Sequence, residues 1–318
     1  MNSMPSKQNT FENQKLINFF LFLVLIISLV TLVSLYASRG VRHYGPDTTI
    51  VIRKDVFEDM TLIARSAIVY DINNKKVLFQ KNADETFALA SVTKIMTALT
   101  ALDLLQYSNV ITIKNEFLAQ EGDSGLLSGE KWNFRDLLDF SLVMSSNDGA
   151  AAIASAAGAF IHRDNQTLDR GAFIKKMNEK AAAIGMTTAS FYNETGLDEP
   201  NGKNGGYASA RDLTKLFEHT LRTYPTVLEA TREAAITVTS GSNFIHRANN
   251  TNTSVSIIPN LIGSKTGFTD IAGGNLGIIF DAGLDRPIAI IVLSSTLQGR
   301  FSDVETLTQK TLENISQE

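Results

Sequence analysis

One long apolar segment near the N-terminus divides this chain into two parts of different physical character. Residues Leu16 to Ala37 are almost wholly apolar, and the exceptions are Asn18 and a few small hydroxyl side chains. At about 1.5 Å per residue, some 20 helical residues cross the roughly 30 Å hydrocarbon core of a bilayer, whereas the apolar region of a cleavable signal peptide has about 7 to 15 residues. Leu35 and Tyr36 occupy positions where a cleavage site requires small residues. The sequence therefore predicts an uncleaved transmembrane helix.

The remaining chain is long enough for one folded domain. We expect a short cytoplasmic tail at 1–15, the transmembrane anchor at 16–37, a linker at 38–60 and a single domain at 61–318. The positive-inside rule does not favour an outside location for that domain, because basic residues lie on both sides of the span: Lys7 and Lys15 before it, and Arg39, Arg42, Arg53 and Lys54 after it. The charge pattern therefore gives no orientation for the predicted transmembrane helix.

Composition excludes several classes of protein. The 318 residues are 44% hydrophobic and 19% charged, which fits a globular protein with a substantial core rather than a disordered chain. The formal net charge of −4 offers no basic surplus for phosphate backbones, so nucleic acid is excluded as a partner. There is no cysteine, and disulfides, thiol catalysis and thiolate metal sites are excluded with it.

Strand signals lie at both ends of the domain. Ala67 to Tyr70 and Val77 to Phe79, with Asn73 and Asn74 between them, predict a hairpin. Three late apolar runs predict an antiparallel meander: 262–269, 275–280 and 288–293. We expect an α/β (α+β) domain in which the hairpin and the meander form one antiparallel sheet flanked by helices.

Helix signals dominate the middle and the end of the domain. From Ser91 onward, apolar residues follow helical spacing, which places Ser91 in the first turn of a mostly buried helix. Asn133 is the expected N-cap of a second helix. Ser302 and Glu305 form an S-x-x-E pattern, which predicts a capping box at the start of the last helix.

The string Ser91-Val92-Thr93-Lys94 carries the first chemical signal. A serine hydroxyl becomes a good nucleophile when a base removes its proton, and a lysine with a lowered pKa can be that base. Positions i and i+3 share a helix face, so Lys94 can reach Ser91. About one S-x-x-K string is expected by chance in a chain of this length. A second copy, Ser128 to Lys131, lies in a Gly-Glu turn, and we interpret it as a surface loop.

Two further motifs follow the first in a fixed order. Ser145-Ser146-Asn147 lies downstream, and Lys265-Thr266-Gly267 lies on a late predicted strand. A given tripeptide such as K-T-G arises by chance in roughly one chain of this size in ten or twenty, and the ordered set is rarer. The set S-x-x-K, S-D-N and K-T-G is typical of class A β-lactamases and penicillin-binding proteins. Here Ser146 stands where that version has aspartate.

With these motifs, the sequence resembles the low-molecular-mass penicillin-binding proteins, which are D-alanyl-D-alanine carboxypeptidases of peptidase family S11. The resemblance runs from about Ser66 to Glu313 and includes five strings: Ala90 to Thr97, Phe191 to Asp198, Tyr207 to Leu213, Asn250 to Asn252 and Lys265 to Thr269. It implies the serine β-lactamase and penicillin-binding-protein fold, an antiparallel sheet flanked by helices plus an all-helical subdomain, with a catalytic, transpeptidase-like domain at 61–318. The sequence departs from many relatives in lacking a C-terminal β-rich domain and in having its anchor at the N-terminus.

The resemblance also implies roles for individual residues. Ser91 would be the nucleophile, Lys94 its base, and Ser145 the proton relay to the leaving D-alanine. Asn147 would hold Lys94 and bind substrate. Four residues of the late strand would complete the site: Lys265 and Thr266 bind the terminal carboxylate, Gly267 makes room for the acyl group, and the backbone N–H of Phe268 joins that of Ser91 in the oxyanion hole.

Partners and location follow from the same resemblance. The substrate would be a peptidoglycan stem peptide outside the cytoplasmic membrane, with the domain on that side of a single-pass cell-membrane protein, and β-lactam antibiotics would be covalent inhibitors. No cofactor or metal is expected, because His162, His219 and His246 are isolated and show no metal-ligand spacing. Gly122 to Gly125 imitates a trypsin-like nucleophile string, but only His43 precedes it, beside the anchor.

Three alternative functions stay open at this point. A D,D-endopeptidase uses the same serine chemistry on crosslinked peptides. A class A β-lactamase adds a deacylating glutamate in an E-x-x-L-N string, and here Asn165 to Asp169 has asparagine in its place, which predicts slow release of penicilloyl adducts. A non-enzymatic penicillin or peptide sensor is disfavoured because the fifteen residues before the span are too few for an output domain.

Overall fold

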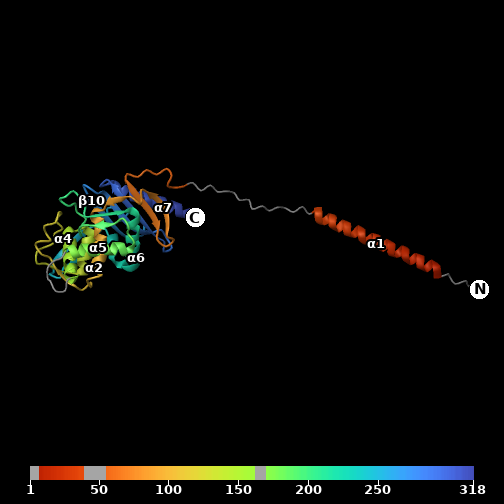
Figure 1. Ribbon diagram of the computed structural model, residues 1–318, viewed down its shortest axis with the longest axis horizontal. Helices are drawn as coiled ribbons and strands as arrows, with labels where there is room; N and C mark the ends of the chain where they lie inside the picture. Colours follow the sequence, from red (N-terminus) through yellow and green to blue (C-terminus); the bar gives the residue numbers. More distant parts are fainter. Residues whose placement is uncertain (1–6, 39–54, 162–169) are drawn as a thin grey trace, which may run out of the picture. The chain divides into compact units, whose positions relative to one another are not determined.

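The computed structural model describes residues 7–38, 55–161 and 170–318 (Figure 1). The chain forms two compact units, Met1–Arg53 and Lys54–Glu318. Predictions that concern residues 1–6, the part 39–54 of the predicted linker 38–60 and the string Asn165 to Asp169 lie outside the described residues.

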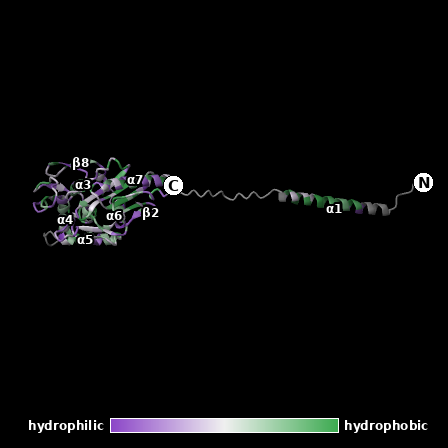
Figure 2. Ribbon diagram, turned by 90° about the horizontal axis from the view of Figure 1, so that it is seen from above, coloured by the Kyte–Doolittle hydropathy of each residue, from purple (hydrophilic) through white to green (hydrophobic). Residues whose placement is uncertain are grey.

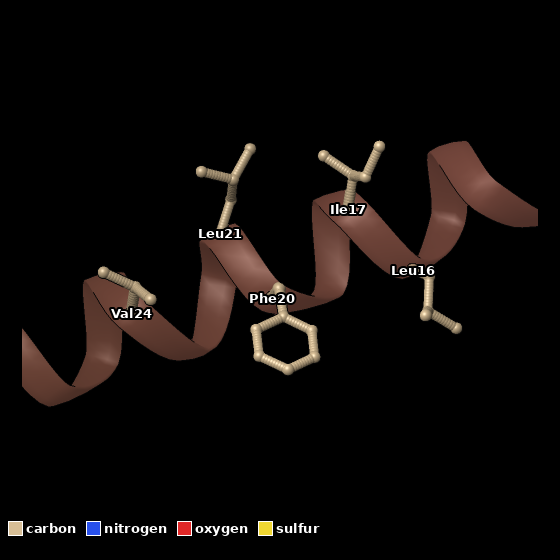
Figure 3. A pocket seen from close by; sticks show the side chains of 5 residues that line it. All are labelled: Leu16, Ile17, Phe20, Leu21 and Val24. Carbon is tan, nitrogen blue, oxygen red and sulfur yellow. The ribbon is translucent and has the colours of Figure 1, made fainter.

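The first unit contains one long helix, α1 (Lys7–Ser38). Its apolar stretch, Gln14–Tyr36, has 23 residues, of which an 18-residue window has a mean hydropathy of 2.9 with none of it buried (Figure 2). Figure 3 shows Leu16 and Phe20 on one side of the helix and Ile17, Leu21 and Val24 on the other, so apolar side chains project in opposite directions. A helix without a polar face does not suit the surface of a soluble domain, and α1 has the length and composition of a membrane span or a signal sequence.

The second unit is built on a five-stranded sheet in the order β10-β11-β12-β1-β2. The strands are β1 (Ser66–Asp71), β2 (Lys76–Lys81), β10 (Leu261–Thr269), β11 (Gly273–Asp281) and β12 (Pro287–Ser295). All neighbouring pairs are antiparallel, and β1 pairs with β12 so that Ile68 lies opposite Ile291. The predicted hairpin, the late meander and their union in one sheet are confirmed.

The two faces of the sheet are covered by different helices. Along β12, Ile288, Ile290 and Val292 pack in one core with α7 (Gly299–Ser316), while Ala289 and Ile291 belong to the larger core on the other face. This alternation is the two-residue period of a strand buried on both faces. On the larger face, α6 (Ala210–Thr223) packs against β12 and β1.

Four helices contribute side chains to the larger core and form the helical part of the domain. They are α2 (Thr93–Leu102), α3 (Phe134–Met144), α4 (Asn147–Ile161) and α5 (Arg170–Ile184), and Figure 1 labels three of them, α2, α4 and α5. Bulky side chains such as Trp132, Phe140 and Phe173 are fully buried among them. The mixed α/β architecture expected from the resemblance is confirmed.

Short elements connect these layers. The strands β3 (Thr86–Ala88), β6 (Ser190–Phe191) and β7 (Gly206–Ser209) form a small sheet, and two ribbons pair β4 (Val110–Thr112) with β5 (Lys131–Asn133) and β8 (Ala235–Thr239) with β9 (Ile245–Asn249). Three 3₁₀ turns complete the described part of the unit: η1 (Ala90–Val92), η2 (Pro225–Val227) and η3 (Glu229–Arg232).

The predicted capping box of the last helix is wrong. The helix α7 begins at Gly299, whose N–H donates to Thr296 Oγ1 over 2.9 Å, so an earlier hydroxyl supplies the acceptor. Ser302 and Glu305 lie inside the helix, and Glu305 accepts a hydrogen bond from Ser254 instead.

Two other sequence expectations differ in detail from the structure. Asn133 occupies the N-cap of α3 with an extended backbone, but its side chain donates to Asp136 and caps no helical N–H. Contacts of the second unit begin before Thr61, because Val56 and Phe57 are already buried and Phe57 stacks on Phe79.

Candidate active site

Ser91 lies in a tight turn between β3 and α2. The preceding residue, Ala90, has a left-handed φ of 48°, and its N–H donates to Asn204 Oδ1. A β-carbon at Gly196 would lie 1.9 Å from the Ala90 carbonyl oxygen, so only glycine allows this approach of the two backbones. Contacts with neighbouring segments therefore hold the turn in its strained conformation, as is common for strained residues at functional sites.

Lys94 points back from the first turn of α2 toward Ser91. Its ammonium donates three hydrogen bonds: to Ser91 Oγ at 2.8 Å, to Asn147 Oδ1 at 2.6 Å and to the Thr195 carbonyl oxygen at 2.9 Å. The side chain is fully buried, and loss of hydration lowers the pKa of Lys94 to about 7, although the negative charge of Glu194 acts in the opposite direction. At neutral pH a large fraction of Lys94 is therefore uncharged.

The three contacts of Lys94 decide where its lone pair points after it loses a proton. An ammonium group has three N–H donors, and all three are used here. Asn147 Oδ1 and Thr195 O are acceptors that have no proton to donate to the amine, whereas the hydroxyl of Ser91 has one. The neutral amine therefore keeps two donated bonds and directs its lone pair at the hydroxyl of Ser91.

Ser145 and Asn147 flank the turn between α3 and α4. Ser145 ends α3 in the left-handed conformation, with φ 63° and ψ 33°. Asn147 begins α4, and its amide joins two segments: Oδ1 accepts from Lys94, and Nδ2 donates to the Glu121 carbonyl at 2.6 Å. Ser145 and Ala90 are thus two non-glycine residues with positive φ beside the reactive groups.

Lys265 reaches the same place from β10. Its ammonium donates to Ser145 Oγ at 2.8 Å and to the Thr266 carbonyl at 3.0 Å. Burial, together with the nearby positive charges of Lys94 and Arg300, holds the pKa of Lys265 well below that of an exposed lysine. A negatively charged group bound beside Lys265 would reverse this effect and favour its charged form.

The following residues of β10 pass close to the serine turn. Thr266 is buried, and its Oγ1 lies 2.5 Å from Thr251 Oγ1. A β-carbon at Gly267 would lie 2.5 Å from the Leu89 carbonyl oxygen and 3.1 Å from the Ser91 nitrogen. Phe268 follows with a side chain that is 43% exposed. The strand therefore runs beside the N–H of Ser91, and glycine is required for that approach.

All eight residues predicted for the site belong to this region. Five of them are joined by hydrogen bonds into two groups, Ser91 with Lys94 and Asn147, and Ser145 with Lys265. Thr266, Gly267 and Phe268 continue the strand from Lys265.

Three contacts of the site were not found from motif spacing. The Thr195 carbonyl accepts from Lys94, Thr251 contacts Thr266, and Arg300 of α7 donates from Nη1 to the Gly267 carbonyl at 2.7 Å. In the sequence, Thr195 and Thr251 are indicated only by the family resemblance of the strings that contain them. Arg300 had no signal, because it acts on a backbone atom from the first turn of α7, 33 residues further along the chain.

The middle serine and the imitation nucleophile string form a separate buried network. Ser146 Oγ donates to Ser124 Oγ at 2.7 Å, and Ser124 donates to Asp148 Oδ2 at 3.1 Å. Burial raises the pKa of Asp148. These contacts include no histidine, so Ser124 has a structural role. The second S-x-x-K copy is also structural, since Ser128 and Lys131 are both exposed.

Within residues 7–38, 55–161 and 170–318, no cluster of metal-ligating side chains is present. His246 instead contacts Glu130 Oε1 at 2.6 Å, and its ring packs against that of Trp132 with the two planes tilted by 45°. His43 and His162 lie outside the described residues.

A buried lysine aimed at a serine, a second buried lysine on the adjacent strand and a mixed α/β frame define a serine peptidase of the penicillin-binding-protein class. The chain belongs to peptidase family S11, D-alanyl-D-alanine carboxypeptidase, whose family model matches residues 53–295. The family resemblance inferred from the motifs is confirmed.

Curated relatives of two kinds are similar to this chain. It is 31% identical over 247 residues to D-alanyl-D-alanine carboxypeptidase DacF of Bacillus subtilis, which covers 76% of this chain and 60% of DacF. It is 33% identical over 246 residues to a D-alanyl-D-alanine endopeptidase of Pseudomonas aeruginosa, which covers 74% of this chain and 72% of that protein. The match therefore spans about three fifths of the carboxypeptidase relative and nearly three quarters of the endopeptidase.

Solved structures agree with the fold. Penicillin-Binding Protein D2 from Listeria monocytogenes, in its cefotaxime-bound form, superposes with a TM-score of 0.65 at 30% identity, covering 79% of this chain and 98% of that chain. A single-site mutant of the Streptomyces K15 DD-transpeptidase gives a TM-score of 0.71 at 25% identity, covering 80% of this chain and 99% of that chain. The penicillin-binding-protein fold is thereby confirmed.

Proposed function

We propose that this chain is a serine D-Ala-D-Ala carboxypeptidase that removes the terminal D-alanine from peptidoglycan stem peptides through an acyl-enzyme on Ser91. The observation that carries this proposal is the 2.8 Å contact between Lys94 Nζ and Ser91 Oγ, made by a buried lysine whose pKa is about 7. An activated serine beside a base is what formation of an ester from a peptide bond requires.

In the first step, neutral Lys94 takes the proton of Ser91 as Oγ attacks the carbonyl carbon between the two D-alanines. Negative charge develops on the carbonyl oxygen, and the N–H groups of Ser91 and Phe268 stabilise it. The close approach of Gly267 to the Ser91 nitrogen supports this placement of the oxyanion hole.

In the second step, the carbon–nitrogen bond breaks and the departing D-alanine amine receives a proton. Ser145 Oγ delivers it and takes a replacement proton from the Lys265 ammonium, 2.8 Å away. Asn147 keeps Lys94 aligned through its 2.6 Å contact. When water later hydrolyses the ester, the proton of the water returns through Ser145 to Lys265, and Lys94 returns its proton to the oxygen of Ser91.

The terminal carboxylate of the substrate binds to Lys265 and Thr266. Lys265 is buried among like charges that disfavour its ammonium form, and an incoming carboxylate relieves that repulsion. Thr266 offers a hydroxyl that Thr251 orients at 2.5 Å. A free carboxylate is thus the group that the strand is suited to select, which favours removal of a C-terminal residue.

β-Lactams act as covalent inhibitors in this proposal, because their amide carbonyl and carboxylate meet the same groups. The relative from Listeria, solved in its cefotaxime-bound form, supports this. The penicilloyl ester is released slowly, since the sequence has asparagine where a class A β-lactamase has its deacylating glutamate.

The helix α1 anchors the enzyme in the cell membrane with the catalytic domain on the extracytoplasmic side. The apolar length of 23 residues supports the anchor, and the location of peptidoglycan supports the orientation. A reporter enzyme fused at Glu318 that is active only in the cytoplasm would reverse this orientation.

A D,D-endopeptidase is the second candidate, and the 33% identity to the endopeptidase of Pseudomonas aeruginosa favours it. Residues 40–318 should be incubated with a D-Ala-D-Ala pentapeptide and with a crosslinked dimer, alongside a fluorescent penicillin. Release of free D-alanine together with a denaturation-resistant adduct supports the carboxypeptidase. Cleavage of the dimer alone supports the endopeptidase, and an adduct without turnover of either peptide supports a sensor.

A further inference from the structure

Glu194 is a buried carboxylate whose residue directly precedes Thr195, the residue whose carbonyl accepts from Lys94, and the proposed reaction gives it no part. Its side chain is 3% exposed. Its backbone is fixed to α2 by two hydrogen bonds on one helix face: Thr97 Oγ1 donates to the Glu194 carbonyl at 2.7 Å, and Lys94 Nζ donates to the next carbonyl, Thr195 O, at 2.9 Å. The carboxylate therefore belongs to the same short segment that holds the base.

The turn around Glu194 is rigid. Asn193 Oδ1 accepts from the N–H groups of Thr195 and Gly196 at 3.2 and 2.7 Å, which closes the turn immediately after Glu194. Gly196 packs against the carbonyl of Ala90, beside Ser91. Glu194 thus has a fixed relation to both members of the S-x-x-K pair.

Arg170, the first residue of α5, forms an ion pair with Glu194. Arg170 Nε donates to Glu194 Oε2 at 2.8 Å, and the arginine side chain is 55% exposed. Both residues line a cavity of about 250 Å³ together with Glu116, Ser155 and apolar side chains of α4. Arg170, the partner of the buried Glu194 carboxylate, is therefore partly exposed to solvent. It can be substituted without disturbing the core.

The charged groups around the base are accordingly few and identifiable. Lys265 lies near Lys94 on β10, Arg300 adds a second positive charge near Lys265, and Glu194 is the negative charge that acts on Lys94. Glu194 is faced by Arg170 from α5 and by Glu116 across the cavity, while the described residues of α4 contribute no charged side chain to that lining.

We propose that Glu194 is a positioning residue whose buried carboxylate, partly neutralised by Arg170, sets the fraction of Lys94 that is free to accept the proton of Ser91. A negative charge near an amine favours the ammonium form, and a positive charge disfavours it. The pair therefore adjusts the pH at which the enzyme becomes competent, and does so from outside the substrate-binding strand. This inference rests on the proposed acylation of Ser91.

The alternative is that the Arg170 and Glu194 pair only ties α5 to the loop before β7. The two interpretations differ in the sign of the expected effects. A purely structural pair, when broken from either side, weakens folding and lowers the rate at all pH values. A tuning pair shifts the pH dependence in opposite directions, because Glu194→Gln removes a negative charge and Arg170→Gln removes a positive one.

The experiment measures the rate of Ser91 acylation by a fluorescent penicillin between pH 5 and pH 9 on the full chain in detergent. Glu194→Gln keeps an oxygen acceptor for Arg170. We expect the acidic side of its pH–rate profile to move to lower pH by about 0.5 to 1 unit, which is less than the roughly one to three units typical of an adjacent charge because Arg170 partly neutralises Glu194. Arg170→Gln should move the acidic side of the profile to higher pH. Glu194→Asp should restore most of the wild-type profile.

The matched control is Asp103→Asn, which removes another α5 ion pair, the 2.8 Å contact with Lys180, at the opposite end of α2. Its pH profile should not move. Shifts of the same sign in both Glu194→Gln and Arg170→Gln, or no shift in either, would overturn the inference. If Glu194→Gln fails to fold, the direction of the Arg170→Gln shift decides. No adduct on the wild type would instead reject the proposed function, as Ser91→Ala should show none in any case.

Discussion

Lys265 donates a hydrogen bond from its ammonium to Ser145 Oγ over 2.8 Å, and the two residues are 120 positions apart in the sequence. Lys265 belongs to the edge strand β10, and Ser145 closes α3 in a left-handed turn. This bond joins the sheet and the helical part of the domain at the place where the proposed mechanism protonates the leaving amine. A rigid frame on both sides of a proton relay keeps its donor and acceptor aligned during the reaction.

Ser145→Ala should slow acylation of Ser91 by about 10² to 10⁴-fold, the usual worth of a positioned proton-transfer group. The reason is that the Lys265 ammonium would keep its place but would lose the hydroxyl that passes the proton on. Stopped-flow measurement with a fluorescent penicillin gives the rate, and thermal unfolding verifies that the variant is folded. A rate within about a factor of two of wild type would contradict the assignment of Ser145 as the relay.

The two S-x-x-K strings offer a matched pair of substitutions. Ser91→Ala should abolish the covalent adduct, because its hydroxyl is the one that Lys94 contacts at 2.8 Å. Ser128→Ala should leave the adduct at the wild-type level, since Ser128 is exposed and Lys131 of the same string begins β5 with an exposed side chain. Denaturing gel electrophoresis after labelling measures both, and adduct loss in Ser128→Ala alone would reverse the assignment.

Acylation should depend on pH through Lys94. Burial lowers its pKa to about 7, and only the neutral amine can take the Ser91 proton, so activity is gained as the pH rises through 7 and lost as it falls. Below about pH 6 the rate should drop by about tenfold per pH unit, as the neutral fraction does. Lys94→Arg keeps the charge but cannot deprotonate, and it should show no acylation across the range. A flat rate from about pH 5 to 7 would exclude Lys94 as the base.

Gly267→Ala should lower acylation without preventing folding of the remaining sheet. A β-carbon there would lie 2.5 Å from the Leu89 carbonyl and 3.1 Å from the Ser91 nitrogen, so β10 must move away from the serine turn. A displacement of about 1 Å can cost about a hundredfold in rate. The ratio of acylation rates, with circular dichroism to monitor structure, gives the answer, and an unchanged rate would show that the strand does not need this approach.

The parts of the site that the sequence predicts are those encoded by local spacing. Ser91 and Lys94 are three residues apart at the start of a helix, so their contact follows from helix geometry alone. The sheet could be predicted because its strands are long, apolar and bounded by turn residues. In both cases the signal is contained in a short run of neighbouring residues.

The parts that the sequence does not predict depend on backbone atoms and on short elements. The carbonyls of Thr195 and Gly267 accept from Lys94 and Arg300, and a carbonyl oxygen leaves no mark in a sequence pattern. The three-residue strands β4 and β5 are too short to show a period. The predicted start of α7 is wrong because Thr296 offers its hydroxyl earlier than Ser302 does.

Asp303 should be the most costly residue to remove from α7, for a reason that has nothing to do with catalysis. Its buried carboxylate accepts from the N–H groups of Ile63 and Ala64 at 2.9 and 2.8 Å and from Ser295 Oγ at 2.7 Å. These bonds fasten the segment that enters β1 to the last helix. Asp303→Ala leaves three donors without their acceptor and should reduce the free energy of unfolding by about 2 to 4 kcal/mol.

The control for Asp303→Ala is Glu313→Ala on the same helix. Glu313 is 46% exposed and pairs with Lys310 at 2.8 Å, and such exposed pairs contribute about 0 to 1 kcal/mol. Urea unfolding of the two variants should therefore separate them clearly, while acylation of the folded fraction stays at the wild-type rate in both. Equal stability of the two variants would mean that the three bonds of Asp303 are replaced by water, and a lower acylation rate in Asp303→Ala would mean that the attachment of α7 also aligns Arg300, three residues away, with β10.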